Sequence, residues 1–171
     1  MKILLTGGAG FIGSHLSARL LVDGHNLAVM DILDDFYDPA MKRANLAIAG
    51  EAGAFELIEC DIRDQAAVEA AFGRLKPEAV IHLAARAGVR PSLRQPLLYE
   101  SVNVGGTVTL LDAARRHDVR RFVFASSSSV YGAASSVPFR EDDPVRRPIS
   151  PYAATKLAGE EMCYTYSHLY G

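Results

Sequence analysis

Short apolar runs along this chain alternate with segments whose apolar positions recur every three or four residues. The run at residues 3–5 predicts a buried strand, and the segment after it repeats its apolar positions as an amphipathic helix does. The same pattern predicts further strands at 26–30, 54–59, 79–83 and 122–125. Helices are predicted at 39–48, 65–75, 96–117 and 151–170, with Asp38 and Asp64 as N-caps of the first two.

This alternation of strands and helices predicts a parallel sheet. Strands joined by connections of crossover length run in the same direction, and the connecting helices cover both faces of the sheet. The run 79–83 is apolar except for His82, as expected for a strand that is buried on both faces. We therefore expect an α/β fold, a single Rossmann-like, doubly wound domain over residues 1–171 with about five strands. Ligands of such sheets bind beyond the carboxyl ends of the strands.

Composition narrows the classes of function. The chain is 49% hydrophobic and 22% charged with a formal net charge of −2, so it has no basic footprint for a nucleic-acid partner. No apolar run approaches the ~20 residues of a membrane helix, and the first residues do not have the pattern of a signal peptide. Cys60 and Cys163 form neither a disulfide framework nor a ligand cluster, so we expect a reducing cytoplasm and no metal site.

Three glycines, Gly7, Gly10 and Gly13, separate the first strand from the first helix. In a dinucleotide-binding turn, such glycines allow the tight turn, the approach of backbone amides to a pyrophosphate, and close helix–strand packing. A helix that begins at Phe11 and Ile12 adds free N–H groups and a partial positive charge. The spacing is G-x-x-G-x-x-G, however, and a plain β-turn-α connection accounts for the glycines by themselves equally well.

The acidic residue Asp31 follows the second predicted strand, 18 residues after Gly13. Dinucleotide-binding folds place a carboxylate near this position, where it accepts hydrogen bonds from the adenosine ribose. A carboxylate there would repel a 2′-phosphate, so the position predicts NAD rather than NADP. The alternative is that Asp31 merely begins a polar loop.

Two further strand ends carry candidate cofactor contacts. Asp61 can reach an adenine amino group with Ile62 against the ring, and it can equally cap the following helix. Leu83, Ala84 and Ala85 lie where a cofactor would run along the strand ends. Small residues are also common where a strand meets a helix, so the two alanines are a weak signal by themselves.

A tyrosine and a lysine share one face at the start of the last predicted helix. Tyr152 and Lys156 are four residues apart, and an ammonium beside a phenol favours the phenolate. A phenolate can take a proton from an alcohol as hydride leaves its carbon. The lysine can also hold the nicotinamide ribose, and Ser127 can hydrogen-bond the substrate oxygen. The alternatives are a solvated Tyr–Lys pair and a polar serine turn.

An ordered set of motifs resembles the extended short-chain dehydrogenase/reductase family. The motifs are Thr6-Gly-Gly-Ala-Gly-Phe-Ile-Gly-Ser-His15, His82-Leu-Ala-Ala85, Asn103-Val-Gly-Gly-Thr107, Ser126-Ser-Ser-Ser-Val-Tyr-Gly132 and Ser150-Pro-Tyr-Ala-Ala-Thr-Lys156. Within the family they resemble the NAD-dependent nucleotide-sugar epimerases and dehydratases. The resemblance implies Ser127, Tyr152 and Lys156 as catalytic residues, with Ser127 assigned because it stands four residues before Tyr131.

The resemblance also implies NAD as the cofactor and a set of residues that contact it. Asn103 is expected among them as a supporting residue near the active site. The expected contacts are Gly7, Gly10, Phe11, Ile12, Gly13, Asp31, Asp61, Ile62, Leu83, Ala84, Ala85, Asn103, Tyr152 and Lys156.

The residues before Tyr131 favour one reaction of the family. Related dehydratases and decarboxylases carry a glutamate two residues before this tyrosine, and dehydratases add an aspartate before it. This chain has Ser128 and Ser129 there, which favours a 4-epimerase. Segments 35–39 and 87–92 resemble UDP-glucuronate 4-epimerases, so a UDP-sugar is the expected substrate.

The implied reaction moves a hydride out and back. NAD⁺ takes hydride from C4 of the sugar while Tyr152 takes the hydroxyl proton, and the hydride then returns to the other face of the 4-keto intermediate. Two alternatives stay open. One is another enzyme of the family, such as a dehydratase or a reductase, and the other is a truncated, non-catalytic NAD-binding domain.

Family members continue beyond this last helix with at least one more strand and a portion that holds the sugar nucleotide. We therefore expect the C-terminal substrate portion to be absent from these 171 residues. The strand at 122–125 would then have a bare edge. Unpaired edges recruit other chains, so self-association as a homodimer is a hypothesis.

Overall fold

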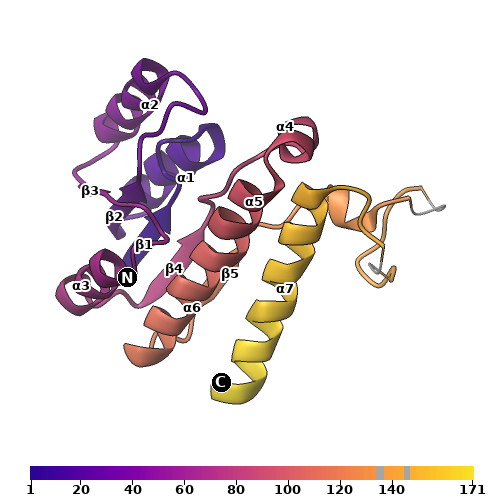
Figure 1. Cartoon of the computed structure of the whole chain (residues 1–171). Coiled ribbons are helices and arrows are strands. Elements are labelled where there is room, and N and C mark those ends of the chain that lie inside the picture. Colours follow the sequence, from indigo (N-terminus) through magenta and orange to yellow (C-terminus); the bar gives the residue numbers. More distant parts are fainter. Residues whose placement is uncertain (134–136, 145–146) are drawn as a thin grey trace.

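The computed structural model describes residues 1–133, 137–144 and 147–171 of the chain (Figure 1). The described strands are β1 (Lys2–Thr6), β2 (Asn26–Asp31), β3 (Glu56–Glu59), β4 (Ala79–His82) and β5 (Phe122–Phe124). The described helices are α1 (Phe11–Val22), α2 (Pro39–Glu51), α3 (Gln65–Leu75), α4 (Val89–Arg94), α5 (Pro96–Tyr99), the π-helix η1 (Glu100–Gly105), α6 (Gly106–Arg116), the 3₁₀ turn η2 (Ser128–Tyr131) and α7 (Pro151–Tyr170).

The described strands form one parallel sheet in the order β3-β2-β1-β4-β5, which confirms the predicted doubly wound fold. In the central strand β1, Leu5 pairs with Val29 of β2 and with Ile81 of β4. The chain runs outward from β1 to β3 and then crosses back to β4, so the order reverses between β1 and β4. Ligands of this fold bind beyond the strand ends at such a switch point.

Two hydrophobic clusters cover the two faces of the sheet. Successive side chains of a strand point to opposite faces, so Leu4 enters one cluster and Leu5 the other. The first cluster includes Phe72 of α3 and Leu110 of α6, and the second includes Leu46 of α2. The long helix α7 lies beside α6 (Figure 1). In the described part of the chain, no helix is both long and apolar enough to cross a membrane.

The helix predicted at 96–117 is helical throughout, to Arg116, but the structure shows a π-helix in its interior. The segment contains the short helix α5, the π-helix η1 and then α6. Thr107, in the first turn of α6, donates its hydroxyl proton to the backbone oxygen of Asn103 at 2.5 Å. A π turn holds one residue more than an α turn, and the continuous helical pattern of the sequence does not reveal the extra residue.

Other differences from the sequence-based elements concern ends and short segments. The helix α4 lies where the apolar pattern predicted no element, β3 begins at Glu56, and α2 continues to Glu51. Both predicted N-caps are confirmed. The carboxylates of Asp38 and Asp64 accept hydrogen bonds at 2.8 and 3.0 Å from backbone amides in the first turns of α2 and α3.

A buried histidine joins β1, β4 and α6. His82 is 1% exposed, and its Nδ1 and Nε2 lie 2.7 and 2.9 Å from the hydroxyls of Thr6 and Thr107. Because the Thr107 proton goes to the oxygen of Asn103, His82 must donate from Nε2 and accept at Nδ1 from Thr6. Thr6 in turn accepts from the backbone N–H of Ala84 at 3.3 Å. This chain of hydrogen bonds requires a neutral imidazole with a fixed tautomer.

The neutral form of His82 should make the stability of the fold depend on pH. Burial, with a smaller contribution from the Lys156 charge, lowers the pKa of His82 from 6.5 to about 3. The folded state therefore binds fewer protons, so this stability is complete above pH 6.5 and is lost as the pH falls toward 3. Between pH 6.5 and about pH 5, the loss should be about 2 kcal/mol.

The measurement is urea unfolding near neutral pH and near pH 5 for the wild type, His82→Gln and the control His168→Gln, which changes an exposed imidazole at the end of α7. The wild type and the control should lose more stability on acidification than His82→Gln does. Equal losses in all three proteins would contradict the prediction. If His82→Gln does not fold, the NMR resonances of His82 in the wild type should still show no protonation down to about pH 5.

Candidate active site

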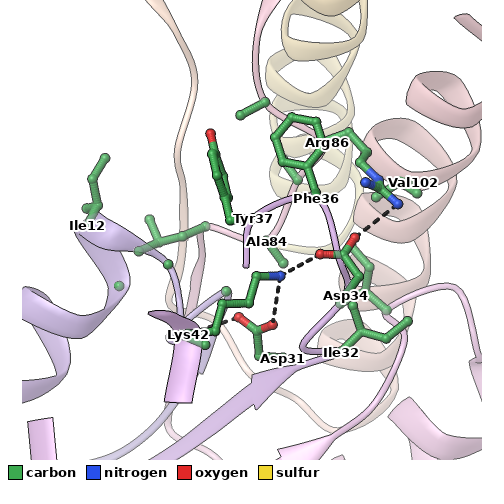
Figure 2. Close-up of a pocket in the computed structure, with 18 of the residues that line it drawn as sticks. Ile12, Asp31, Ile32, Asp34, Phe36, Tyr37, Lys42, Ala84, Arg86 and Val102 are labelled. Carbon is green, nitrogen blue, oxygen red and sulfur yellow. Dashed lines mark hydrogen bonds and ion pairs between the residues drawn. The ribbon is translucent and has the colours of Figure 1, made fainter. Parts of the chain in front are cut away.

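A cavity of about 570 Å³ opens at the carboxyl ends of the strands (Figure 2). Its lining comes from the turn after β1, the loops after β2, β3 and β4, the end of β5 and the start of α7. Every predicted cofactor contact except Asn103 lines this cavity, and so do the predicted catalytic residues Tyr152 and Lys156. The structure therefore brings together residues that lie as far apart as the two ends of the sequence.

The glycine turn brings α1 close to the strands. Gly7 has a φ of +75°, and a Cβ there would lie 2.6 Å from the backbone nitrogen of Ala84. A Cβ at Gly13 would collide with the carbonyl oxygen of Gly7. The close approach places the N-terminus of α1, with the exposed side chains of Phe11 and Ile12, at the edge of the cavity. The first-turn amides of a helix carry partial positive charge, which favours an anion at this position.

Asp31, the last residue of β2, is held at the cavity wall by backbone donors. One carboxylate oxygen accepts from the N–H of Ala9 at 3.1 Å, and the other accepts from the N–H of Leu33 at 2.9 Å. Asp31 is 9% exposed and lies 4.0 Å from the Lys42 ammonium. The carboxylate is therefore oriented by the glycine turn before any ligand is present.

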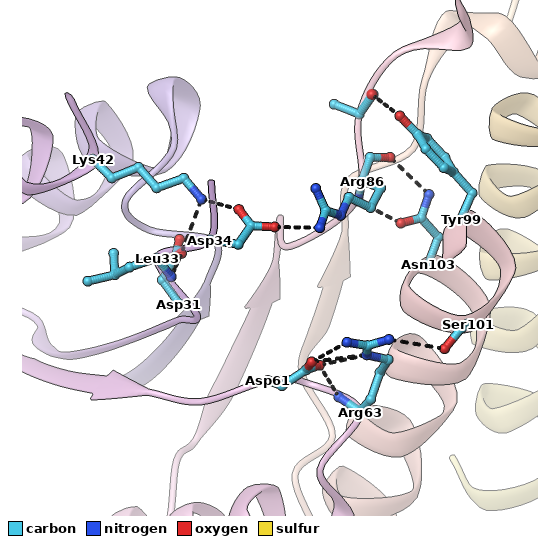
Figure 3. Close-up of polar contacts among 11 residues, drawn as sticks. Asp31, Leu33, Asp34, Lys42, Asp61, Arg63, Arg86, Tyr99, Ser101 and Asn103 are labelled. Carbon is cyan, nitrogen blue, oxygen red and sulfur yellow. Dashed lines mark hydrogen bonds and ion pairs between the residues drawn. The ribbon is translucent and has the colours of Figure 1, made fainter. Parts of the chain in front are cut away.

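A row of charges that the sequence pattern did not predict crosses the cavity beside Asp31 (Figures 2 and 3). Lys42 of α2 is buried, and its ammonium lies 2.5 Å from one oxygen of Asp34. The other oxygen of Asp34 lies 3.0 Å from the guanidinium of Arg86, which comes from the loop after β4. The sequence offered one signal for this row of charges, a lysine on the face of α2 that is turned toward an acidic loop. It offered none for Arg86, because its partner Asp34 lies 52 positions away along the chain.

Asp61 and Ile62 lie after β3 on the far side of Asp31. Asp61 does not cap α3, because Asp64 does, so the helix-cap alternative for Asp61 is wrong. Hydrogen bonds from the Arg63 guanidinium lower the pKa of the Asp61 carboxyl, which also accepts from the Arg63 backbone N–H at 2.9 Å. Ile62 is 5% exposed and packs where Gly106 leaves no side chain in α6. Asp61 thus forms a polar part of the cavity wall, and Ile62 forms an apolar part.

The first two turns of α7 carry Tyr152 and Lys156. Ser150 caps this helix by accepting from the N–H of Ala153 at 3.1 Å, and Pro151 occupies the first helical position. This cap fixes where α7 begins and therefore which residues of its first two turns face the cavity. Tyr152 meets the ring of Tyr99 edge to face, with the ring centroids 6.2 Å apart.

Lys156 is almost fully buried, at 4% exposure. Its ammonium donates to the backbone oxygen of Ala125 at 2.7 Å and lies 4.9 Å from the centroid of the Phe124 ring. Burial lowers the pKa of Lys156 from 10.5 to about 8. The ammonium therefore loses its proton more readily than that of an exposed lysine, and it lines the same cavity as Tyr152.

Two predicted site residues are not part of the cavity lining. Ser127 caps the 3₁₀ turn η2, and its hydroxyl oxygen accepts from the N–H of Ser129 at 3.2 Å and from the Ser129 hydroxyl at 2.8 Å. Its neighbour Ser126 lines the cavity and donates its hydroxyl to Glu160 of α7. The catalytic role of Ser127 thus stays a prediction.

Asn103 is buried behind the cavity and acts as a connector. Its side-chain oxygen accepts from the backbone N–H of Arg86 at 2.7 Å, and its side-chain nitrogen donates to the backbone oxygen of Arg86 at 3.0 Å. The same nitrogen donates to the hydroxyl of Thr155, next to Lys156, at 3.0 Å. Asn103 therefore supports the loop after β4 and the first turns of α7, and its direct contact with a cofactor stays a prediction.

Comparison with known proteins places these features in one group of enzymes. The family model described as GDP-mannose 4,6 dehydratase matches residues 4–171. UDP-glucuronate 4-epimerase 3 of Arabidopsis thaliana is 44% identical over 171 residues, which are 99% of this chain and 40% of that protein. A probable UDP-glucuronate 4-epimerase of Rhizobium meliloti (strain 1021) is 39% identical over 170 residues, which are 99% of this chain and 50% of that protein.

Solved structures agree with this placement. The UDP-glucose 4-epimerase of Thermus thermophilus, in complex with NAD, matches with a TM-score of 0.86 and 37% identity over 100% of this chain and 52% of that chain. The UDP-Glc/GlcNAc 4-epimerase of Campylobacter jejuni matches with a TM-score of 0.91 and 33% identity over 98% of this chain and 49% of that chain. The chain thus spans about half the length of its relatives. Because the family model covers residues 4–171, the chain belongs to the family described as GDP-mannose 4,6 dehydratase, among the extended short-chain dehydrogenase/reductase enzymes that its motifs resemble.

Proposed function

We propose that this chain is an NAD-dependent 4-epimerase of a UDP-sugar, or the cofactor-binding half of one. The observation that carries the proposal is the cavity in which the glycine turn, Asp31 and the Tyr152–Lys156 pair meet. The similar structures from Thermus thermophilus and Brucella ovis are UDP-glucose 4-epimerases with bound NAD, which supports both the cofactor and the reaction. Residues 1–171 would form one cofactor domain, and the free cysteines Cys60 and Cys163 fit a reducing cytoplasm.

The residues of the cavity fit a dinucleotide. The first amides of α1 would hold the diphosphate, and Asp31 would accept from the adenosine ribose. Ile62 and Ala84 offer an apolar surface for the adenine between the loops after β3 and β4. When bound, NAD⁺ supplies a hydride acceptor that can return the hydride to the other face of the sugar carbon.

The residues at the nicotinamide end of the cavity would transfer the proton of the sugar hydroxyl. Tyr152 would take the proton of the sugar C4 hydroxyl, because it stands at the cavity wall at the start of α7. The buried Lys156 would hold the nicotinamide ribose, and Ser127 would hydrogen-bond the substrate oxygen. These roles move one proton on and off the sugar, so the overall reaction is an isomerisation.

The sugar at this site is best matched by UDP-glucuronate. Segments 35–39 and 87–92 resemble UDP-glucuronate 4-epimerases, and the relatives from Arabidopsis thaliana and Rhizobium meliloti carry that name. The family description names a dehydratase instead. Ser128 and Ser129 stand where dehydratases carry acids, however, and an elimination needs an acid or base that serine does not supply.

Replacement of Asp31 should reduce NAD⁺ affinity. A hydrogen bond to a charged group contributes about 1.5–3 kcal/mol, so Asp31→Asn should weaken NAD⁺ binding about 10- to 100-fold. Calorimetric titration of the wild type should show clear preference for NAD⁺ over NADP⁺, and Asp31→Asn should narrow that preference. The control is Asp35→Asn, which changes an exposed carboxylate four residues further on. Equal affinity of the wild type for both nucleotides would contradict the proposed role.

Replacement of Tyr152 should separate catalysis from binding. Tyr152→Phe keeps the ring beside Tyr99 but removes the proton acceptor, so epimerisation should fall about 10²- to 10⁴-fold. The assay follows conversion of UDP-glucuronate to its C4 epimer by NMR, with NAD⁺ affinity measured in parallel. Unchanged turnover would reject Tyr152 as the base. With UDP-glucose as a second substrate, whose C6 carries the hydroxyl that an elimination needs, formation of a 4-keto-6-deoxy sugar would indicate a dehydratase. Net consumption of NADH with a carbonyl substrate would indicate a reductase. Binding of NAD⁺ without turnover of any kind would identify a cofactor half.

The edge of β5 should support self-association, which we propose as a homodimer. In the described residues, β5 pairs with β4 alone, and Val123 in this edge strand is 57% exposed. An unpaired edge can add a strand from a second chain. Light scattering across a concentration series should show a rising mass that Val123→Lys reduces, whereas the control Val22→Lys, on exposed α1, should behave as the wild type. A constant monomeric mass of the wild type would exclude this association.

A further inference from the structure

The ion pair between Asp34 and Arg86 joins two loops on opposite sides of β1. Asp34 follows β2, and Arg86 follows β4, while the sheet order places β1 and its glycine turn between these strands. Figure 3 shows the two side chains reaching toward each other from the two loops. A dinucleotide that lies along the strand ends has to pass this connection to enter or leave the cavity.

Several contacts strengthen this connection. Arg86 also lies over the ring of Phe36, with its guanidinium carbon 5.2 Å from the ring centroid (Figure 2). The second oxygen of Asp34 is held by the buried Lys42. The side chains of Asp34 and Arg86 are only 23% and 19% exposed, so water screens their attraction less than it screens a surface pair.

The two ends of the connection differ in how they are anchored. On the β4 side, both backbone polar groups of Arg86 are bonded to the side chain of Asn103 in the π-helix. On the β2 side, Leu33 has a φ of +52°, a backbone conformation that a branched side chain rarely adopts. The N–H of Leu33 is bonded to Asp31. On the β2 side, therefore, Asp34 is held by its side-chain contacts with Lys42 and Arg86, whereas the backbone of Arg86 is itself anchored.

We propose that Asp34 and Arg86 form a latch across the cofactor cavity that limits how fast the dinucleotide enters and leaves. The latch rests on the proposed function, because it acts on the cofactor of that reaction. A reaction that withdraws a hydride and returns it to the same sugar requires the reduced cofactor to stay bound between the two steps. A latch that opens slowly keeps the reduced cofactor bound between the two steps. Because the pair spans two loops at the strand ends, opening it lies on the path in both directions.

Two other roles for Arg86 make different predictions. If Arg86 bound the dinucleotide directly, its removal would raise the dissociation rate and leave the association rate unchanged or lower. If Arg86 only stabilised the fold, its removal would lower the melting temperature without changing either rate. A latch is distinguished by faster association and faster dissociation together.

The test is stopped-flow kinetics with NADH as the probe, since the chain contains no tryptophan to interfere with nucleotide fluorescence. Arg86→Gln should raise both the association and the dissociation rate about tenfold, which corresponds to about 1.4 kcal/mol in each barrier. The dissociation constant should change less than the rates do. The matched control is Arg94→Gln, which removes an exposed arginine of α4 outside the cavity lining and should leave both rates unchanged.

Asp34→Asn should reproduce the effect, and the double variant should be little faster than either single one, because the two changes break the same pair. If Arg86→Gln does not fold, Asp34→Asn by itself still tests the latch. Unchanged rates in both folded variants, or faster dissociation without faster association, would overturn the latch alone. Failure of the wild type to bind NADH and NAD⁺ would overturn both the latch and the proposed cofactor.

Discussion

The close packing of α1 against the turn after β1 is the constraint on which the whole cavity depends. A side chain at Gly13 would collide with the carbonyl of Gly7, and one at Gly7 would meet the backbone of Ala84. These approaches fix the N-terminus of α1 relative to the loop after β4. Ala9, inside the same turn, donates its N–H to Asp31 and so orients the carboxylate of the neighbouring strand. One backbone turn therefore aligns the N-terminus of α1, the loop after β4 and the carboxylate of Asp31.

Local patterns are enough to predict the sheet and the part of the site that lies on it. Short apolar runs between helical segments predict strands, and parallel strands bring their carboxyl ends to one edge, so the amino-acid pattern alone places Gly7, Asp31 and Ala84 together. The positions of these residues depend on where each strand and helix begins and ends, which the sequence encodes locally. The caps Asp38 and Asp64 are predictable for the same reason, because a cap lies next to the helix that it begins.

Features that depend on long-range pairing are not predictable in this way. The Arg86 guanidinium finds Asp34 only because two loops meet over β1, and no spacing along the chain encodes that meeting. Ser127 shows the converse. Its motif predicts a place at the substrate, while in the structure its hydroxyl oxygen accepts from the local turn that it caps. A motif thus fixes the element on which a side chain sits, whereas its orientation depends on neighbours that come from elsewhere in the chain.

The π-helix η1 lies between α5 and α6. One extra residue in its turn sets its register and thus the direction in which its side chains point. Asn103 faces both the backbone of Arg86 and the hydroxyl of Thr155 in that register. An α-helix turns by about 100° per residue, so loss of one residue between 100 and 105 would restore a regular helix and swing Asn103 away from both partners. Surface loops of this fold can change length at little cost. In evolutionary terms, this helix is therefore a place where a sequence can drift by substitution but not by single-residue insertion or deletion.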